Sequence, residues 1–285
     1  MTIFTRHNPT DDLILHGRVL ASPAKPRAVI AVVHGFGEHT GRYTGIAEGL
    51  GELGFAVLGL DLHGHGSTPG RRGYVKSYTR FHEDVEMLLV EARSRFPGLS
   101  VYLWGHSMGG GLVLDFVFEN GALEREEGQL AGVIATAPLI EAVDPPPAPL
   151  FAVMKLLEKA APKLTLRNPI TGEQISTLPE EQARYAEDTL NHDKLTLALG
   201  SRILESGKRT ASRKGAFPVP LLLMHSRDDT LTRFEASERF ARGRDNCNFH
   251  PFEGVAHELH NDSSRGEVLR LIDAFVTDTL PARTA

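Results

Sequence analysis

The strongest constraint on the fold is a repeated alternation between short apolar segments and longer segments with helical periodicity. The helical pattern is clear at 43–53, at 77–96 and in a final stretch near 266–279. Continuously apolar strands that are separated by helices indicate a parallel sheet covered on both faces. The sequence therefore predicts an α/β fold with a mostly parallel central sheet. Its expected strands lie in the apolar runs at 27–35, 55–61, 99–105, 131–138, 219–226 and 248–253.

Two regions depart from this alternation. The segment DLILHGRVL at 12–20 alternates apolar and polar residues, which predicts an antiparallel edge strand. Between 138 and 218 the alternation stops, and the segment DPPPAPL at 144–150 contains four prolines that exclude a regular helix there. We therefore expect a helical cap insertion at 138–218 on a core domain made of 1–137 and 219–285.

Composition excludes several functional classes. The chain has 285 residues, 41% of them hydrophobic, which is enough for one large core. Its net charge is −5 with both signs scattered, so no nucleic-acid surface or polybasic membrane anchor is expected. The single cysteine, Cys247, excludes an internal disulfide framework. With neither a signal-peptide pattern nor a long apolar span, the sequence predicts a cytoplasmic protein that acts on small molecules.

A glycine-flanked serine is the clearest catalytic signal. The segment GHSMG at 105–109 follows a predicted strand and precedes a predicted helix. In this G-x-S-x-G context the serine occupies a strained turn, and its neighbours two positions away must be glycine to avoid steric clashes. Since ligand sites lie at the carboxyl ends of parallel strands, we expect Ser107 to be a nucleophile rather than part of a packing turn.

A serine nucleophile needs a base and an acid that orients the base. In folds of this kind the acid and then the histidine follow later strands. The run ending in MHSRDDTL offers Asp228 and Asp229, and the loop after the next predicted strand offers His257. His257 is the expected base, with His260 as the second candidate.

The oxyanion of the reaction needs fixed backbone donors. The N–H of Met108, at the predicted helix start, is one expected donor. The loop HGFGEH at 34–39 follows an apolar strand and would supply the second donor from Phe36.

The loop DLHGHGST at 61–68 raises a metal hypothesis. Asp61, His63 and His65 have ligand-like spacing, but a distant fourth ligand and thiolate support are missing. We therefore expect Asp61 to brace its loop through local hydrogen bonds, and the predicted mechanism needs no metal or organic cofactor.

Four segments carry a resemblance to a known family. The chain resembles α/β-hydrolases of the monoacylglycerol lipase and lysophospholipase group, also classed as serine aminopeptidase-like hydrolases. The resemblance implies the α/β-hydrolase fold, with 138–218 as the cap. The matching segments are HGFGEHTGRY at 34–43, DLHGHGST at 61–68, GHSMGG at 105–110 and FEGVAHELH at 252–260.

The resemblance also implies roles for individual residues. It selects Asp228 as the acid, and it places Glu38, Arg42 and His260 near the polar head group of a substrate. One segment departs from the group. Where those lipases tend to carry a cap tyrosine, this chain has Leu190, and Tyr185 is the nearby alternative.

Together these features predict a serine carboxylic-ester hydrolase that cleaves lipid-like monoesters such as monoacylglycerol through an acyl-enzyme. A lysophospholipase, short-acyl esterase, thioesterase or peptidase would use the same triad, so these activities remain alternatives. A homologue that binds the ligand without turnover is a further alternative of a different class.

The apolar stretch after the prolines has two interpretations. Its apolar residues spread too far around a helix for one packing face, which favours a mobile lid that touches a membrane. Alternatively, the stretch is buried against the body of the enzyme. The residues concerned are Leu150, Phe151, Val153, Met154, Leu156 and Leu157.

Overall fold

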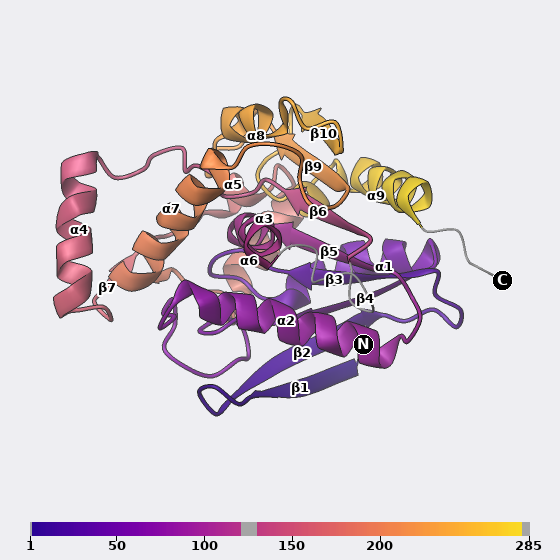
Figure 1. Ribbon diagram of the computed structural model, residues 1–285, viewed down its shortest axis with the longest axis horizontal. Coiled ribbons are helices and arrows are strands. Elements are labelled where there is room, and N and C mark those ends of the chain that lie inside the picture. The colour runs from indigo at the N-terminus through magenta and orange to yellow at the C-terminus, as the bar shows by residue number, and fades with distance from the viewer. Residues whose placement is uncertain (1, 121–129, 281–285) are drawn as a thin grey trace.

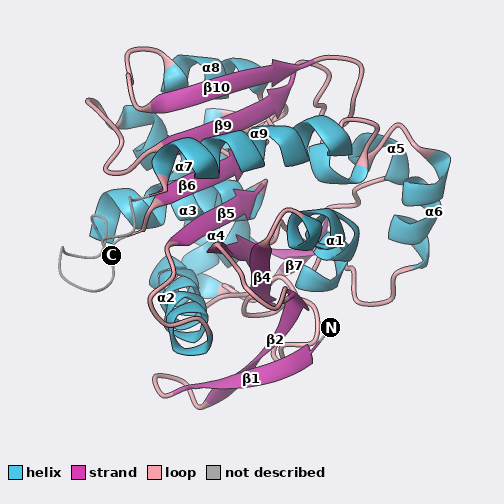
Figure 2. Cartoon of the chain, turned by 90° about the vertical axis from the view of Figure 1, so that its right-hand side faces the viewer, coloured by secondary structure: helices cyan, strands magenta, loops and turns pink. Residues whose placement is uncertain are grey.

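The computed structural model describes residues 2–120 and 130–280. Its centre is an eight-stranded sheet in the order β1-β2-β4-β3-β5-β6-β9-β10, which Figure 2 shows running from β1 at the bottom to β10 at the top. The strands are β1 (Thr2–Asn8), β2 (Leu13–Ala21), β3 (Ala28–Val33), β4 (Phe55–Leu60), β5 (Val101–His106), β6 (Gly132–Thr136), β9 (Leu221–Ser226) and β10 (Cys247–Phe252).

The sheet is parallel from β4 to β10, as the apolar runs predict. Strand β2 is antiparallel to β4, which confirms the expected orientation of this segment. It is not the edge strand, however, because β1 pairs with its outer side. The sequence does not predict β1, because only Phe4 and Asn8 of its seven residues are buried and the strand therefore has no apolar run.

Helices cover both faces of the sheet. Two apolar clusters flank it, and α2, α3, α7 and α8 contribute to one while α1 and α9 contribute to the other. The predicted two-sided α/β architecture is therefore confirmed. The core helices are α1 (Thr44–Glu52), α2 (Tyr78–Arg95), α3 (Met108–Asn120), α8 (Phe234–Ala241) and α9 (Arg265–Thr279), with 3₁₀ turns η1 (Thr40–Tyr43) and η2 (Leu259–Asn261).

The segment 138–218 is mostly helical. Helix α7 packs beside α3, where its Leu199 and Ile203 join the core cluster, whereas α4 lies at the outer edge of the molecule (Figure 1). The domain boundaries stay a prediction. The segment contains α4 (Ala148–Ala160), β7 (Thr165–Arg167), α5 (Gly172–Ile175), α6 (Pro179–Glu187), β8 (Lys194–Thr196) and α7 (Leu197–Ser212).

None of the helices in the described ranges has the length and hydrophobicity needed to span a bilayer. The cytoplasmic location stays a prediction.

Candidate active site

Ser107 occupies a sharp turn between the end of β5 and the start of α3. Its backbone φ is +55°, a left-handed conformation that is strained for a residue with a side chain. A Cβ on Gly105 would lie 2.3 Å from the carbonyl oxygen of Gly109, and a Cβ on Gly109 would lie 2.3 Å from that of Val33. The two glycines therefore permit the close approach of β3, β5 and α3 that presents the serine.

The residue beside the histidine is Asp229, which corrects the expectation for Asp228. The Nδ1 atom of His257 lies 2.6 Å from Oδ2 of Asp229. Asp228 is exposed and its carboxylate accepts the N–H of Gly254 at 2.6 Å. Because the two aspartates are neighbours in a tight turn, their side chains leave it in different directions and one alone reaches the imidazole.

Asp229 is held in a dense set of hydrogen bonds. Its Oδ1 accepts the N–H groups of Leu231 and Thr232 at 2.7 and 3.1 Å. Its Oδ2 lies 2.7 Å from the hydroxyl of Thr232 and 3.0 Å from Nε2 of His225. These contacts fix the position of the carboxylate independently of His257. The orientation of the His257 imidazole is therefore set by a buried and rigid group.

Electrostatics favour the charged state of this pair. Burial opposes the imidazolium, but the attraction and hydrogen bond of Asp229 outweigh burial and raise the pKa of His257 above its ordinary value. Burial likewise opposes the carboxylate, yet the attraction of His257 and the hydrogen bonds from His225 and His257 hold the pKa of Asp229 well below its usual range. The arrangement can therefore stabilise an imidazolium that forms when His257 accepts a proton.

The two predicted oxyanion donors are the backbone amides of Met108 and Phe36. Met108 is the first residue of α3, so its N–H has no acceptor within the helix. Phe36 lines the same two cavities as Ser107. The loop that carries it is fixed by Glu38, whose Oε1 accepts the N–H of Gly35 at 2.5 Å. Met108 therefore follows the serine directly and Phe36 lines its cavities, and donation by either amide to an oxyanion stays a prediction.

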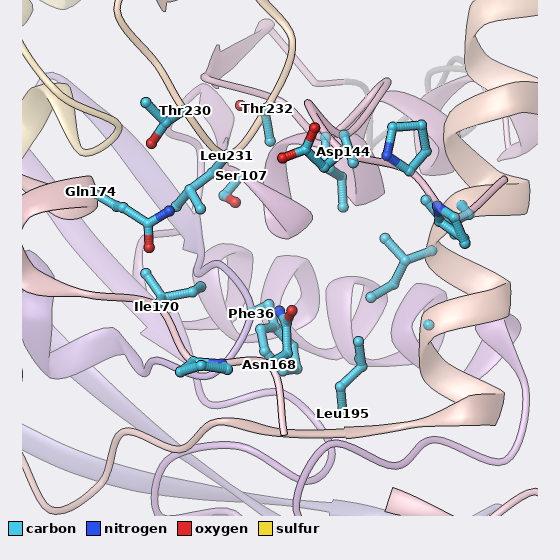
Figure 3. A pocket seen from close by; sticks show the side chains of 18 of the residues that line it. Phe36, Ser107, Asp144, Asn168, Ile170, Gln174, Leu195, Thr230, Leu231 and Thr232 are labelled. Atoms are coloured by element: carbon cyan, nitrogen blue, oxygen red, sulfur yellow. The ribbon is translucent and has the colours of Figure 1, made fainter. Parts of the chain in front are cut away.

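A largely apolar cavity of about 470 Å³ opens at Ser107. In Figure 3 the serine lies at its inner end, with Phe36, Ile170 and Leu231 around it. Residues of 138–218 form most of the remaining wall, including Met154 of α4. The cavity can accommodate an apolar chain next to the reactive hydroxyl.

A second and much smaller cavity, of about 10 Å³, also adjoins Ser107. Glu38, Tyr185 and Glu258 line it together with Ser107 and His257. Arg42 lies directly behind this wall, 2.6 Å from Oε2 of Glu258 and 3.3 Å from Oε2 of Glu38. Its guanidinium also lies 4.7 Å from the ring centre of Tyr185.

The carboxylates of Glu38 and Glu258 share the guanidinium of Arg42 as their one cationic partner in this wall. Burial and then the repulsion of Glu258 raise the pKa of Glu38 to about 7, against the attraction of Arg42. Oε2 of Glu38 has no hydrogen-bond partner within the described residues. Glu38 thus lines the cavity at Ser107 and Arg42 lies behind it, and contact of either residue with a head group stays a prediction. No sequence pattern indicates Glu258, because its role depends on Arg42 of a distant segment.

His260 does not reach this cavity, which corrects the expectation that it contacts a head group. It is completely buried, with its ring stacked on Tyr43 at 4.6 Å and edge-on to Trp104 and His106. Burial lowers the pKa of His260 to about 3. It is a core histidine behind the site and makes no contact that would let it replace His257 as the base.

The loop at 61–68 is braced as expected. Asp61 accepts hydrogen bonds from the Arg18 side chain, from the N–H of Thr40 and from the N–H of Ser67. A different group, Glu38, His106 and Glu258, has ligand atoms within 4.8 Å of one another in the described residues. Arg42 and Tyr43 already engage its carboxylates, so this group is occupied by protein partners.

Comparisons with known proteins agree with this geometry. Residues 24–264 match the family described as serine aminopeptidase, S33. The chain is 31% identical to a monoacylglycerol lipase of Mycolicibacterium smegmatis over 258 residues, which cover 90% of each protein. It is 32% identical to human monoglyceride lipase over 243 residues, which cover 83% of this chain and 77% of the human protein.

A solved structure is similar over almost the whole chain. The crystal structure of Paleococcus ferrophilus monoacylglycerol lipase superposes with a TM-score of 0.81 at 28% identity. The match covers 93% of this chain and 99% of that one. With the glycine-flanked serine, the buried Asp229–His257 pair and the family match in agreement, the chain belongs to the serine aminopeptidase S33 family and has the α/β-hydrolase fold.

Proposed function

We propose that this protein is a serine carboxylic-ester hydrolase that cleaves monoacylglycerols to fatty acid and glycerol through an acyl-enzyme. The observation that carries the proposal is the position of Ser107, which lines the apolar cavity and also a second cavity of about 10 Å³ with Glu38, Tyr185 and Glu258 in its wall. An ester bound across the serine would place its acyl chain on one side and its alcohol on the other. The names of the bacterial and human relatives support the same substrate class.

The mechanism assigns one step to each group. His257 takes the proton of Ser107 as the hydroxyl attacks the ester carbonyl, while Asp229 holds the imidazole tautomer and stabilises its positive charge. The amides of Phe36 and Met108 donate hydrogen bonds to the tetrahedral oxyanion. His257 then protonates the leaving alcohol, and water repeats the sequence to release the fatty acid.

The polar wall suits an alcohol that carries further hydroxyls. Glu38 and Glu258 offer carboxylate acceptors, and Tyr185 offers a phenol in place of the cap tyrosine that the sequence lacks at Leu190. Arg42 holds both carboxylates in position from behind. Hydroxyl groups can donate to such acceptors, whereas the phosphate of a lysophospholipid would be repelled by the ionised carboxylate of Glu258.

The test compares alcohol groups at a fixed acyl chain. Release of fatty acid is measured from monoacylglycerol, from lysophosphatidylcholine and from a thioester, together with p-nitrophenyl esters of rising chain length. We expect the highest kcat/KM on the monoacylglycerol and labelling of Ser107 by a fluorophosphonate. Faster turnover of lysophosphatidylcholine would contradict the head-group assignment, and failure to label would contradict the hydrolase mechanism itself.

We also propose that α4 contacts the lipid surface from which the substrate enters. The outward side of this helix is apolar, and its contacts with α7 include ion pairs. Lys155 Nζ lies 3.0 Å from Glu205 of α7, and Arg202 of α7 lies 3.1 Å from Glu158 of α4. The outward side consists of Leu150, Val153, Leu156 and Leu157, which are 52%, 50%, 69% and 43% exposed.

Helices of water-facing surfaces show the opposite arrangement, with the apolar side inward. Contiguous exposed apolar surface of this kind marks a site that binds lipid or protein. Met154 of the same helix lines the apolar cavity, so a lipid surface at α4 would lie beside the route to Ser107.

A further inference from the structure

A second surface feature lies at one end of α4. A pocket of about 650 Å³ is lined by four cationic side chains, one carboxylate and parts of β7. Its lining residues are distinct from those of both cavities at Ser107. We call it the basic pocket, and its lining is Arg71, Arg72, Thr165, Leu166, Arg167, Asp193 and Lys194.

Most of the positive charge in the basic pocket is not neutralised by the protein. Arg167 pairs with Asp193 at 2.7 Å. Arg71 donates to the hydroxyl of Thr165 at 3.1 Å and Arg72 donates to backbone carbonyls, all of which are neutral acceptors. Within the described residues, neither these two arginines nor Lys194 takes part in any of the ion pairs.

A further cation adjoins the pocket. Lys163 is exposed and lies 5.5 Å from the ring centre of Tyr74, again without an ion pair in the described part of the chain. Five cationic side chains therefore face a single carboxylate here, in a protein whose net charge is −5. A concentration of unpaired positive charge on an acidic protein indicates an anionic partner.

The basic pocket and the apolar side of α4 form one continuous surface. The chain leaves α4 at Ala160 and reaches Lys163 within three residues. Leu164 and Leu166, each 48% exposed, extend the apolar surface into β7. In the β7–β8 pairing Arg167 lies opposite Lys194, which places cations directly beside these leucines. Figure 1 shows β7 close to the lower end of α4 at the outer edge of the molecule.

We propose that the basic pocket and the apolar side of α4 together form a docking surface for a bilayer that carries anionic phosphate head groups. The proposal rests on the proposed function in that the ester substrate is taken from such a bilayer. Guanidinium and ammonium groups bind phosphate oxygens through charge-assisted hydrogen bonds, while the leucines enter the acyl boundary. Two weak signals, one apolar and one cationic, are the combination that gives stable membrane attachment.

The experiment measures binding of the full-length chain to vesicles by flotation. Vesicles of phosphatidylcholine alone are compared with vesicles that contain one quarter phosphatidylglycerol. The test variant is Lys163→Glu/Lys194→Glu. The control is Lys25→Glu/Lys214→Glu, an equal charge change at two exposed lysines outside the pocket. Turnover of a soluble short-chain ester and the Tm verify that every variant is folded.

Each cation near an anionic surface contributes roughly a fivefold gain in affinity, so the test variant should bind anionic vesicles about tenfold or more weakly. The control should bind like the wild type, and added salt should weaken wild-type binding. Equal binding to neutral and anionic vesicles would overturn the proposal, as would an equal loss in both double variants.

Two further measurements identify which anionic partner binds the basic pocket. Binding of inorganic phosphate that is lost in the test variant, together with equal binding of wild type and test variant to anionic vesicles, would overturn the proposal in favour of a free phosphate site. Tighter binding to polyglutamate than to anionic vesicles would overturn it in favour of an acidic protein partner. Vesicle binding does not require turnover, so intact binding without monoacylglycerol hydrolysis would contradict the proposed function and leave the docking surface supported.

Discussion

The hydroxyl of Ser107 carries the proposed chemistry, and its removal is the most direct test at the scale of single residues. Ser107→Ala keeps a small side chain in the strained turn, so the Tm should remain near that of the wild type. The catalytic rate on a soluble ester should fall by at least about 10⁴-fold, as for other triad nucleophiles. A folded variant that keeps most of its activity would contradict the acyl-enzyme mechanism.

The adjacent aspartates provide a matched pair of variants. Asp229→Asn should lower the catalytic rate by about 10³- to 10⁴-fold, because an amide favours the wrong tautomer of His257. Asp228→Asn, which removes an exposed carboxylate, should retain most of the rate. Kinetics on one soluble ester compare the two, and the reverse order would return the role of acid to Asp228.

The same pair sets the pH dependence. The base must be neutral to accept the serine proton, and the contact with Asp229 raises the pKa of His257. The kcat/KM of the wild type should therefore rise with pH through a midpoint above the ordinary histidine value of about 6.5. In Asp229→Asn the residual activity should have its midpoint at lower pH. An identical midpoint in both proteins would show that the protonation of His257 does not control the rise of kcat/KM with pH.

The choice between the two aspartates illustrates a limit of reading residues from sequence. Spacing along the chain predicts the turn after β9, since both residues follow an apolar strand. Which side chain points inward depends on the φ and ψ angles of the turn and on partners far away, such as Thr232 and His225. Glu258 shows the same limit, because its role depends on Arg42 of a distant segment.

Among the elements, α4 shows how a helix can be predicted while its orientation is not. Its apolar residues indicate a helix, but periodicity is compatible with a buried helix or with an exposed one. The helix begins at Ala148, inside the proline-rich segment that is expected to exclude one, because proline is tolerated in the first turn. The four exposed apolar residues contradict the fully buried interpretation. Ionic partners on α7, which lie about fifty residues away in the chain, decide the orientation. Contact with a membrane stays a prediction.

That contact predicts a substrate-dependent effect. Leu156→Asp places a charge on the most exposed of these side chains, so the Tm and the turnover of a soluble short-chain ester should be unchanged. Hydrolysis of monoacylglycerol in vesicles should slow by about tenfold or more, because a charged group opposes insertion into the acyl region. Val90→Asp, at a 56% exposed position on α2, is the control and should leave both rates unchanged.

The outcome separates the two interpretations of the helix. Equal losses on the soluble and the vesicle substrate, with a lower Tm, would contradict a lipid-facing role. The same losses in Val90→Asp would show that surface charge in general, rather than α4, controls access to vesicles.

Strands differ in how well the sequence predicts them. The five central parallel strands, β3, β4, β5, β6 and β9, are fully buried, and each overlaps a predicted apolar run. Burial on both faces of the sheet demands unbroken apolar sequence, which makes these strands easy to predict. Strand β1 has one partly covered face and only two buried side chains, so its existence depends on pairing with β2 rather than on its own composition.

At the scale of the whole molecule, Asp61 joins three parts of the chain beneath the site. It is completely buried, and it binds Arg18 of β2, Thr40 directly after the loop at 34–39 and Ser67 of its own loop. Burial alone would raise the pKa of Asp61, but the attraction of His34 and Arg18 and these hydrogen bonds lower it well below its usual range.

Asp61→Asn should therefore destabilise the whole fold. It leaves the nearly buried guanidinium of Arg18 without a charged partner, which costs about 3 kcal/mol or more of the free energy of unfolding at pH 7. Asp273→Asn breaks a partly exposed pair with Arg27 and should cost less than about 1 kcal/mol. Urea unfolding measures both, and equal effects would contradict the bracing role of Asp61.

The sign of the pH effect follows from the lowered pKa. The folded protein keeps Asp61 ionised at a pH where the unfolded chain, with an ordinary carboxyl pKa of about 3.9, binds a proton. This contribution to stability is complete above that value and is lost as the pH falls below about 4. The difference in unfolding free energy between the wild type and Asp61→Asn should accordingly stay constant from pH 7 to 5 and shrink at lower pH. A difference that persists unchanged at pH 3.5 would show that shape or hydrogen bonding, rather than the charge of Asp61, stabilises this junction.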